Sequence, residues 1–165
     1  MRQKGFTLIE LLFTMALSSI ILTGTVVGIH QVMWGTDRSN SQVVALTDLS
    51  QAAVTIKKDL MVTQFTDLTD GNPVPQSSVN LSWVDYTAFE SDNQSRHSSS
   101  YILSGTELQR THDGTVSIVA RNITSIGFTK DGRVVSVVIT ATGPGASQRS
   151  ETLEFSAYFR AEELE

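Results

Sequence analysis

The chain has 165 residues, a formal net charge of −5 and no cysteine. This length suits one domain with an appendage, and the lack of cysteine excludes disulfides, thiolate metal sites and cysteine nucleophiles. The acidic balance, with no basic cluster beyond Lys57 and Lys58, argues against a dedicated nucleic-acid binder, so no nucleic-acid partner is expected. Hydrophobic residues are unevenly placed, because the first 36 residues carry only three charges: Arg2, Lys4 and Glu10.

An uncharged run covers residues 11–29, and further apolar residues lie directly before it. At about 1.5 Å rise per residue, a helix of this length just crosses a hydrocarbon core of roughly 30 Å. Arg2 and Lys4 precede the run, so the positive-inside tendency predicts a single-pass protein with a cytoplasmic N-terminus and the remainder outside the cytoplasm. Trp34 is expected to anchor the outer membrane interface, close to His30.

Glu10 is unusual because a carboxylate in an apolar helix costs about 2.5–3.5 kcal/mol near the bilayer centre, and less near an end. Such a residue is either a functional candidate with a specific partner or a side chain that snorkels to the headgroups. A secretory signal peptide is the competing interpretation of the segment. Its basic start fits, but Glu10 inside the apolar region does not, and the small residues Ala16 and Ser18 come too early for its cleavage site.

The N-terminus reads Lys4-Gly5-Phe6-Thr7-Leu8-Ile9-Glu10. This stretch resembles the class III signal of type IV pilins and type II secretion pseudopilins. The resemblance implies that a prepilin peptidase cuts between Gly5 and Phe6 and methylates Phe6. It also implies an assembly role for Glu10, whose carboxylate would pair with the Phe6 ammonium of a neighbouring subunit and so relieve two poorly solvated charges. The implied partners are prepilin peptidase, sibling pilin or pseudopilin subunits, membrane lipid and an ATPase-driven membrane assembly platform.

The helical pattern continues beyond the apolar run. With no proline before Pro73, one helix is predicted over about residues 7–64, loosened where glycines occur in its first half. The first half needs lipid or other helices as cover, and the second half needs a sheet. Lys57, Lys58 and Asp59 are expected outside the apolar face. That face is predicted from residues that recur every three or four positions: Val43, Leu46, Leu49, Ala53, Ile56 and Leu60.

Strand-like segments joined by turns follow the helix. Loops are predicted at residues 67–76 and 91–100, and hairpins at Gly105 and at Asp131-Gly132. About six strands in meander order would lay an apolar face on the helix, with Trp83 in the core. The predicted fold class is therefore α+β, a long N-terminal helix packed on a small antiparallel sheet. The predicted division is a leader at 1–5, a transmembrane and assembly segment at 6–36, an amphipathic helix half at 37–66 and a β head at 67–165.

Softer motifs lie in the remainder of the chain. The sequences Lys-Lys-Asp-Leu at 57–60, Tyr-x-Leu-x-Gly-x-x-Leu-x-Arg at 101–110 and Asn-Ile-Thr-Ser-Ile-x-Phe at 122–128 resemble minor pilins and pseudopilins of the J or W type. The resemblance implies a structural minor subunit, held in the cytoplasmic (inner) membrane and assembled into a pilus or pseudopilus. The alternative is an adhesin or DNA-uptake tip that binds a ligand through head loops, with residues 91–100 as the place to look.

No catalytic pattern is found in the sequence. His30, His97 and His112 show no ligand spacing, and His112-Asp113-Gly114 is predicted to be a turn and not half of a catalytic dyad. No enzyme activity, cofactor or metal is therefore expected. Two pairs of loop carboxylates could bind calcium, although a solvated acidic loop is the favoured interpretation: Asp67 with Asp70, and Glu90 with Asp92.

Overall fold

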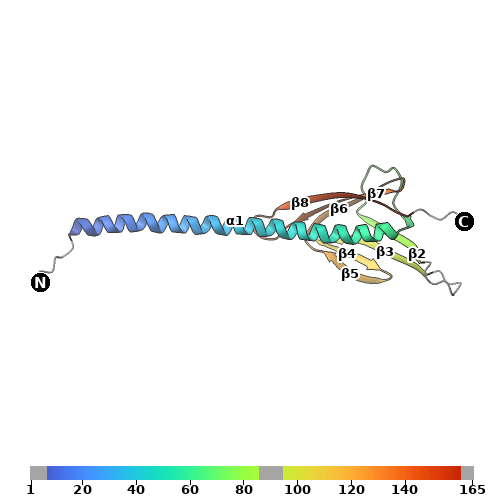
Figure 1. The fold of residues 1–165 in the computed structure, drawn as a ribbon, viewed down its shortest axis with the longest axis horizontal. Helices are drawn as coiled ribbons and strands as arrows, with labels where there is room; N and C mark the ends of the chain where they lie inside the picture. The colour runs from blue at the N-terminus through green and yellow to red at the C-terminus, as the bar shows by residue number, and fades with distance from the viewer. Residues whose placement is uncertain (1–6, 86–94, 161–165) are drawn as a thin grey trace.

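The computed structural model describes residues 7–85 and 95–160. Its first element is one helix, α1 (Leu8–Val62), whose 55 residues extend about 82 Å at 1.5 Å rise per residue. Figure 1 shows the N-terminal half projecting as a bare rod, while the C-terminal half lies along a head made of strands. The helix passes without a break through Gly24, Gly28 and Gly35, so the expected loosening at these glycines does not interrupt it.

Four hydroxyl side chains in the apolar half of α1 are satisfied by the helix itself. Thr14 and Ser19 donate to carbonyls three residues earlier, and Thr23 and Thr25 to carbonyls four residues earlier, all at 2.8–2.9 Å. A polar group that keeps its hydrogen bond within the helix is tolerated in lipid. These four side chains are therefore compatible with a bilayer.

The head consists of two antiparallel sheets in which consecutive strands are neighbours, as the meander prediction required. The described part of the chain holds eight strands in two sheets, instead of about six in one sheet, because neither the short β1 nor the division between sheets has a sequence signal. The larger sheet contains β1 (Phe65–Thr66), β2 (Ser78–Asp85), β3 (Ser95–Ser104), β4 (Glu107–His112) and β5 (Thr115–Ala120). The smaller contains β6 (Ile123–Asp131), β7 (Val134–Thr142) and β8 (Ser150–Tyr158).

Glycines with positive φ close the two predicted hairpins. Gly105 (φ 62°) joins β3 to β4, and Gly132 (φ 57°) joins β6 to β7. Asp131 pairs with Val134, so the second turn is Gly132-Arg133 and not Asp131-Gly132. The first position of this two-residue turn needs a positive φ, which glycine adopts at little cost. Gly132 therefore occupies that position, and this sets the pairing register of β6 and β7.

The prediction of an exposed loop at residues 91–100 is wrong for its second half. Residues 95–100 form the start of β3 and pair with β2, and Ser99 is buried. The serine-rich composition concealed a strand whose alternate residues face the core side. Residues 91–94, together with Glu90, lie outside the described part of the chain.

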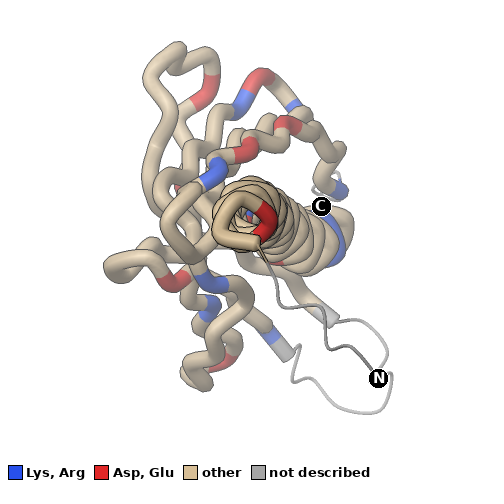
Figure 2. The backbone as a smooth tube through the Cα atoms, turned by 90° about the vertical axis from the view of Figure 1, so that its left-hand side faces the viewer, with Lys and Arg blue, Asp and Glu red and all other residues tan. Residues whose placement is uncertain are grey.

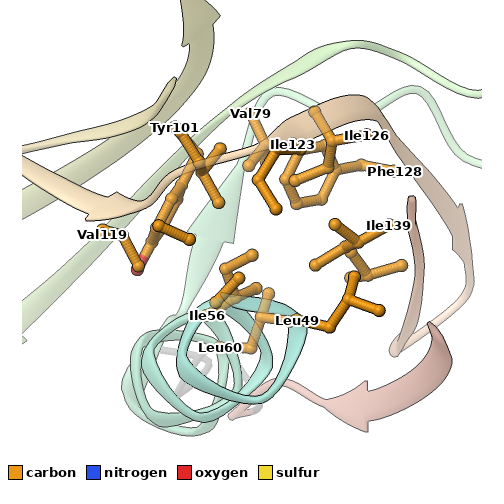
Figure 3. Close-up of a cluster of buried hydrophobic side chains, with 14 of the residues drawn as sticks. Leu49, Ile56, Leu60, Val79, Tyr101, Val119, Ile123, Ile126, Phe128 and Ile139 are labelled. Carbon is orange, nitrogen blue, oxygen red and sulfur yellow. The ribbon is translucent and has the colours of Figure 1, made fainter. Parts of the chain in front are cut away.

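The core lies between one side of α1 and both sheets (Figure 3). Alternation turns one side of the strands toward this core, and β2, β5, β7 and β8 lie against the helix, which is the pattern expected for an antiparallel sheet with one face covered. The largest fully buried side chains come from all three parts of the fold: Leu49, Ile56 and Leu60 from α1, Leu81, Tyr101 and Leu108 from the larger sheet, and Ile123, Phe128 and Ile139 from the smaller one.

The buried face of α1 differs from the predicted stripe. Leu49 is buried as predicted, but Val43 and Leu46 are 57 % and 49 % exposed, while Ala45 and Ala52 are fully buried. Both sets of residues recur every three or four positions, so periodicity alone fits either. On the covered side, the small residues Ala45 and Ala52 leave room for the strands to pack closely against the helix.

Candidate assembly site

Glu10 lies in the first turn of α1, preceded by Thr7 in an extended conformation. The Thr7 carbonyl accepts hydrogen bonds from the backbone N–H of Glu10 (3.1 Å) and of Leu11 (3.2 Å). A carboxylate at this position interacts favourably with the positive end of the helix dipole. The side chain is exposed, so its carboxylate is open to a group from outside the chain. Gly5 and Phe6, the predicted processing residues, lie outside the described residues.

The helix around Glu10 presents large apolar side chains on all sides. Ile9, Phe13, Leu22 and Val32 are 76 %, 67 %, 70 % and 69 % exposed. A window of 18 residues has a mean hydropathy of 2.0, and none of it is buried within the chain. By length and composition, this is a helix able to cross a membrane. So large an apolar surface marks a membrane or interaction site.

The C-terminal half of α1 carries a further apolar surface, here called the outer strip: Val43, Leu46, Val54 and Met61, all exposed. A shallow groove of about 540 Å³ follows the strip from Val43 to Thr55, and another of about 520 Å³ reaches back to Val32. Figure 2 looks along the helix from its N-terminal end and shows the head mainly to one side of it. The outer strip thus continues the apolar surface of the N-terminal half alongside the head.

A buried ion pair fastens the C-terminal end of α1 to the larger sheet. Asp59 is only 4 % exposed. Its Oδ2 accepts hydrogen bonds from the Tyr101 hydroxyl (2.6 Å) and Arg110 Nε (2.7 Å), and its Oδ1 accepts one from Arg110 Nη2 (2.9 Å). Bidentate geometry of this kind is the strong form of an arginine–carboxylate pair. The prediction that Asp59 lies outside the buried face is therefore wrong.

The network also shifts the pKa values of its members. Burial, followed by the hydrogen bond to Asp59, raises the pKa of Tyr101 far above its ordinary value. Desolvation lowers the pKa of Arg110, but its hydrogen bond and charge interaction with Asp59 outweigh this, so the net change is upward. At neutral pH, Tyr101 is therefore a neutral donor and Arg110 a cation.

These contacts explain two of the sequence motifs. Asp59 belongs to the motif at 57–60, and Tyr101 and Arg110 are the first and last residues of the motif at 101–110. Tyr101 and Arg110 are directly opposite each other in the β3–β4 hairpin, so the hairpin brings both to one carboxylate. The residues of these two motifs therefore have a structural role, in which they hold the helix against the sheet.

A second polar cluster lies on the same side of the larger sheet. The ring centroids of Trp83, His97 and His112 lie 5.7–6.3 Å apart in pairs, with interplanar angles of 16–30°. Asp113 Oδ2 lies 2.6 Å from His97 Nδ1, and Asp113 Oδ1 accepts a bond of 2.8 Å from the Ser98 N–H. The bond with His97, and then that from Ser98, lower the pKa of Asp113.

The structure therefore brings together two histidines that the sequence did not associate. Trp83, predicted in the core, is only half-buried. The predicted turn after His112 is confirmed, since β4 ends there and Asp113-Gly114 leads into β5. Asp113 nevertheless contacts His97 in the neighbouring strand, which only the pairing of β3 with β4 reveals.

The loop carboxylates considered for calcium have partners within the protein. Asp67 accepts hydrogen bonds from Asn80 N (2.8 Å) and Nδ2 (2.6 Å), and Asp70 accepts one from Gly132 N (2.7 Å). Among residues 7–85 and 95–160, no group of three or more His, Asp or Glu side chains is placed to hold a metal ion. The other candidate pair, Glu90 and Asp92, lies outside these ranges.

A long apolar N-terminal helix packed on antiparallel sheets is a pilin-like architecture. Residues 1–26 match the family model of the prokaryotic N-terminal methylation motif. No curated protein matches the chain significantly. The chain therefore carries the N-terminal methylation motif that marks the class III signal of type IV pilins and pseudopilins, at the start of a helix long and apolar enough to cross a membrane. Proteins with this motif are in general structural, processed by prepilin peptidase and assembled with other pilins.

Proposed function

We propose that the chain is a minor structural subunit of a type IV pilus-like filament, either a pilus or a type II secretion pseudopilus. One observation carries the proposal: the helix that begins with the methylation motif has an N-terminal half without cover from the rest of the chain. Such a half is stable in a bilayer and, after extraction, in a bundle of like helices. The outer strip would extend the same contact along the head.

Processing would release residues 1–5 and leave a methylated Phe6 as the new N-terminus. Residues 6–36 would then form the transmembrane and assembly segment, residues 37–66 the helix half that carries the head, and residues 67–165 the head. Arg2 and Lys4 support a cytoplasmic N-terminus, with the head outside the cytoplasmic membrane. An assembly platform would then draw the subunit into the filament.

Glu10 would recruit the subunit by pairing with the Phe6 ammonium of a neighbour. Its exposure in the first turn of α1 supports this role, because an apolar setting strengthens the attraction between opposite charges. Replacing Glu10 with Ala should leave processing intact and lower incorporation at least about tenfold, the effect of losing roughly 1.4 kcal/mol of contact energy. Sheared filaments and membranes would be compared by immunoblotting, with intact mass as the test of processing.

Glu154→Ala is the matched control, since it removes the same charge from an exposed position of β8 in the head. It should be incorporated like the wild type. Equal incorporation of Glu10→Ala and Glu154→Ala would remove the assembly role from Glu10. Loss of processing in Glu10→Ala would instead assign this residue to peptidase recognition.

The alternative of an adhesin or DNA-uptake tip has one specific observation in its favour. The partly exposed rings of Trp83, His97 and His112 lie together on strands β2, β3 and β4, and aromatic faces are common contact surfaces for ligands. Under this alternative, Trp83→Ala would abolish ligand or DNA capture while filaments still form. Unchanged capture by such filaments would rule out this surface as the binding site.

A further inference from the structure

The loop between β7 and β8, residues 143–149, rests on the middle of α1. The Arg149 N–H donates to Ser41 Oγ (3.1 Å), and the Gly143 N–H donates to the Arg149 carbonyl (2.8 Å). A Cβ at Gly143 would collide with the backbone of Ser41, and one at Gly145 would crowd the carboxylate of Asp37. The loop is therefore held closely against the helix, at the end of the head that faces the apolar half of α1 (Figure 1).

A groove of about 390 Å³ lies between this loop and the helix, lined by Trp34, Gly35, Arg38, Ser147 and Arg149. Within the described parts of the chain, the side chains of Arg38 and Arg149 have no ion-pair partner. The Ser147 hydroxyl is buried and, among the same residues, has no hydrogen-bond partner. The groove thus combines two cations that have no ion-pair partner with a buried hydroxyl that has no hydrogen-bond partner, while the Asp37 carboxylate lies against Gly145 in the same loop.

The groove lies where the apolar part of α1 ends. The helix from Leu8 to Trp34 is about 39 Å long, close to the roughly 40–45 Å of a bilayer with its headgroups. Trp34 is 77 % exposed, as suits an interfacial anchor. Arg38 follows one turn later, so in an inserted helix it would lie at the depth of the headgroups of the outer leaflet.

We propose that this groove binds the phosphate of an anionic phospholipid headgroup, a site that rests on the membrane insertion in the proposed function. Guanidinium groups match phosphate geometry and bind it with charge-assisted hydrogen bonds. The cationic part of a zwitterionic headgroup would be repelled by two arginines, so an anionic lipid is favoured. Binding would fix the depth and tilt of the head on the membrane before assembly.

The test measures lipid retention by the full chain in mild detergent. Native mass spectrometry would count bound phosphatidylglycerol and phosphatidylcholine on the wild type and on the double variant Arg38→Gln/Arg149→Gln. Lys57→Gln/Lys58→Gln is the matched control, because it removes the same charge from exposed positions farther along α1. Circular dichroism would verify that each variant is folded.

The expected result is preferential retention of phosphatidylglycerol by the wild type and the lysine variant, and about tenfold weaker retention by the arginine variant. Equal retention by the two double variants would overturn the proposal. Displacement of phosphatidylglycerol by an equimolar amount of inorganic phosphate would also overturn it, because the site would then be one for free phosphate.

Flotation with vesicles separates this proposal from the proposed function. A chain that floats with phosphatidylcholine and phosphatidylglycerol vesicles but shows no preferential retention would remove the groove site and leave the membrane anchor standing. A chain that floats with neither would overturn both, because the helix would then not enter a bilayer.

Discussion

The two halves of α1 form one continuous helix, yet they depend on different surroundings. The C-terminal half buries one side against two sheets and is fastened to them by Asp59. In the N-terminal half, the most apolar window has no buried residue. Backbone hydrogen bonds explain why both halves are helical, whereas the stability of a helix in a protein comes mainly from packing. Only the C-terminal half obtains that packing from its own chain. The other half requires a membrane or neighbouring subunits.

Two of the carboxylates of the helix, Asp59 and Glu10, show the same difference. Asp59 is buried and has both partners within the chain, whereas Glu10 is exposed and lies about 74 Å away along the helix axis. One carboxylate therefore stabilises the subunit, and the other is proposed to join subunits. Substitutions that separate fold stability from assembly test this distinction.

The largest expected effect on stability is that of Asp59→Ala. It leaves the Arg110 guanidinium and the Tyr101 hydroxyl without their partner in a buried site, which typically lowers the free energy of unfolding by about 3–5 kcal/mol. Urea denaturation of the full chain in detergent, followed by circular dichroism, measures this loss. Glu10→Ala removes the same charge from the other half and should unfold like the wild type. A loss below about 1 kcal/mol for Asp59→Ala would contradict the fastening role.

The next effect distinguishes the two sides of the C-terminal half. Leu49→Ala should lower the free energy of unfolding by about 2–5 kcal/mol, because it leaves a cavity in the core. Leu46→Ala, three residues earlier on the outer strip, should change it by less than about 0.5 kcal/mol and should instead reduce filament incorporation. Equal destabilisation by the two variants would show that Leu46 contributes to the core.

The smallest expected effect concerns the bond between Asp113 and His97. The pKa of Asp113 is lowered from an ordinary value of 3.8, so its stabilisation is present above pH 3.8 and is lost as pH falls through the lower folded value. Asp113→Asn should therefore reduce the unfolding temperature slightly at pH 7 and hardly at all in strong acid. In a His97→Phe background, the difference at pH 7 should shrink. A difference that grows on acidification would have the wrong sign for this bond.

Local signals in the sequence were sufficient for the helix, the N-terminal motif and the hairpins. Gly132 marks its turn because few other residues readily adopt a positive φ. The apolar run marks a helix able to span a membrane because no other stretch of the sequence is so uniformly apolar. These features depend on residues close together in the chain, so the α+β class could be predicted without the structure.

Features that depend on distant contacts were not predictable in the same way. Both sides of the C-terminal half of α1 have helical periodicity, and only the approach of the sheets selects Ala45 and Ala52 over Val43 and Leu46. Asp59 is a charged residue of the kind expected at the protein surface. Its hydrogen-bond partners lie 42 and 51 residues further along the chain, so no local pattern reveals that it is buried. The meeting of His97 with Asp113 likewise requires the register of β3 on β4.

The most direct test of the central claim is the intact mass of the protein recovered from the membranes of cells with an active prepilin peptidase. If the apolar half of α1 is an assembly helix prepared by processing, the mass should correspond to a chain that begins at Phe6 and carries one methyl group. A chain that still begins at Met1 under these conditions would contradict the account.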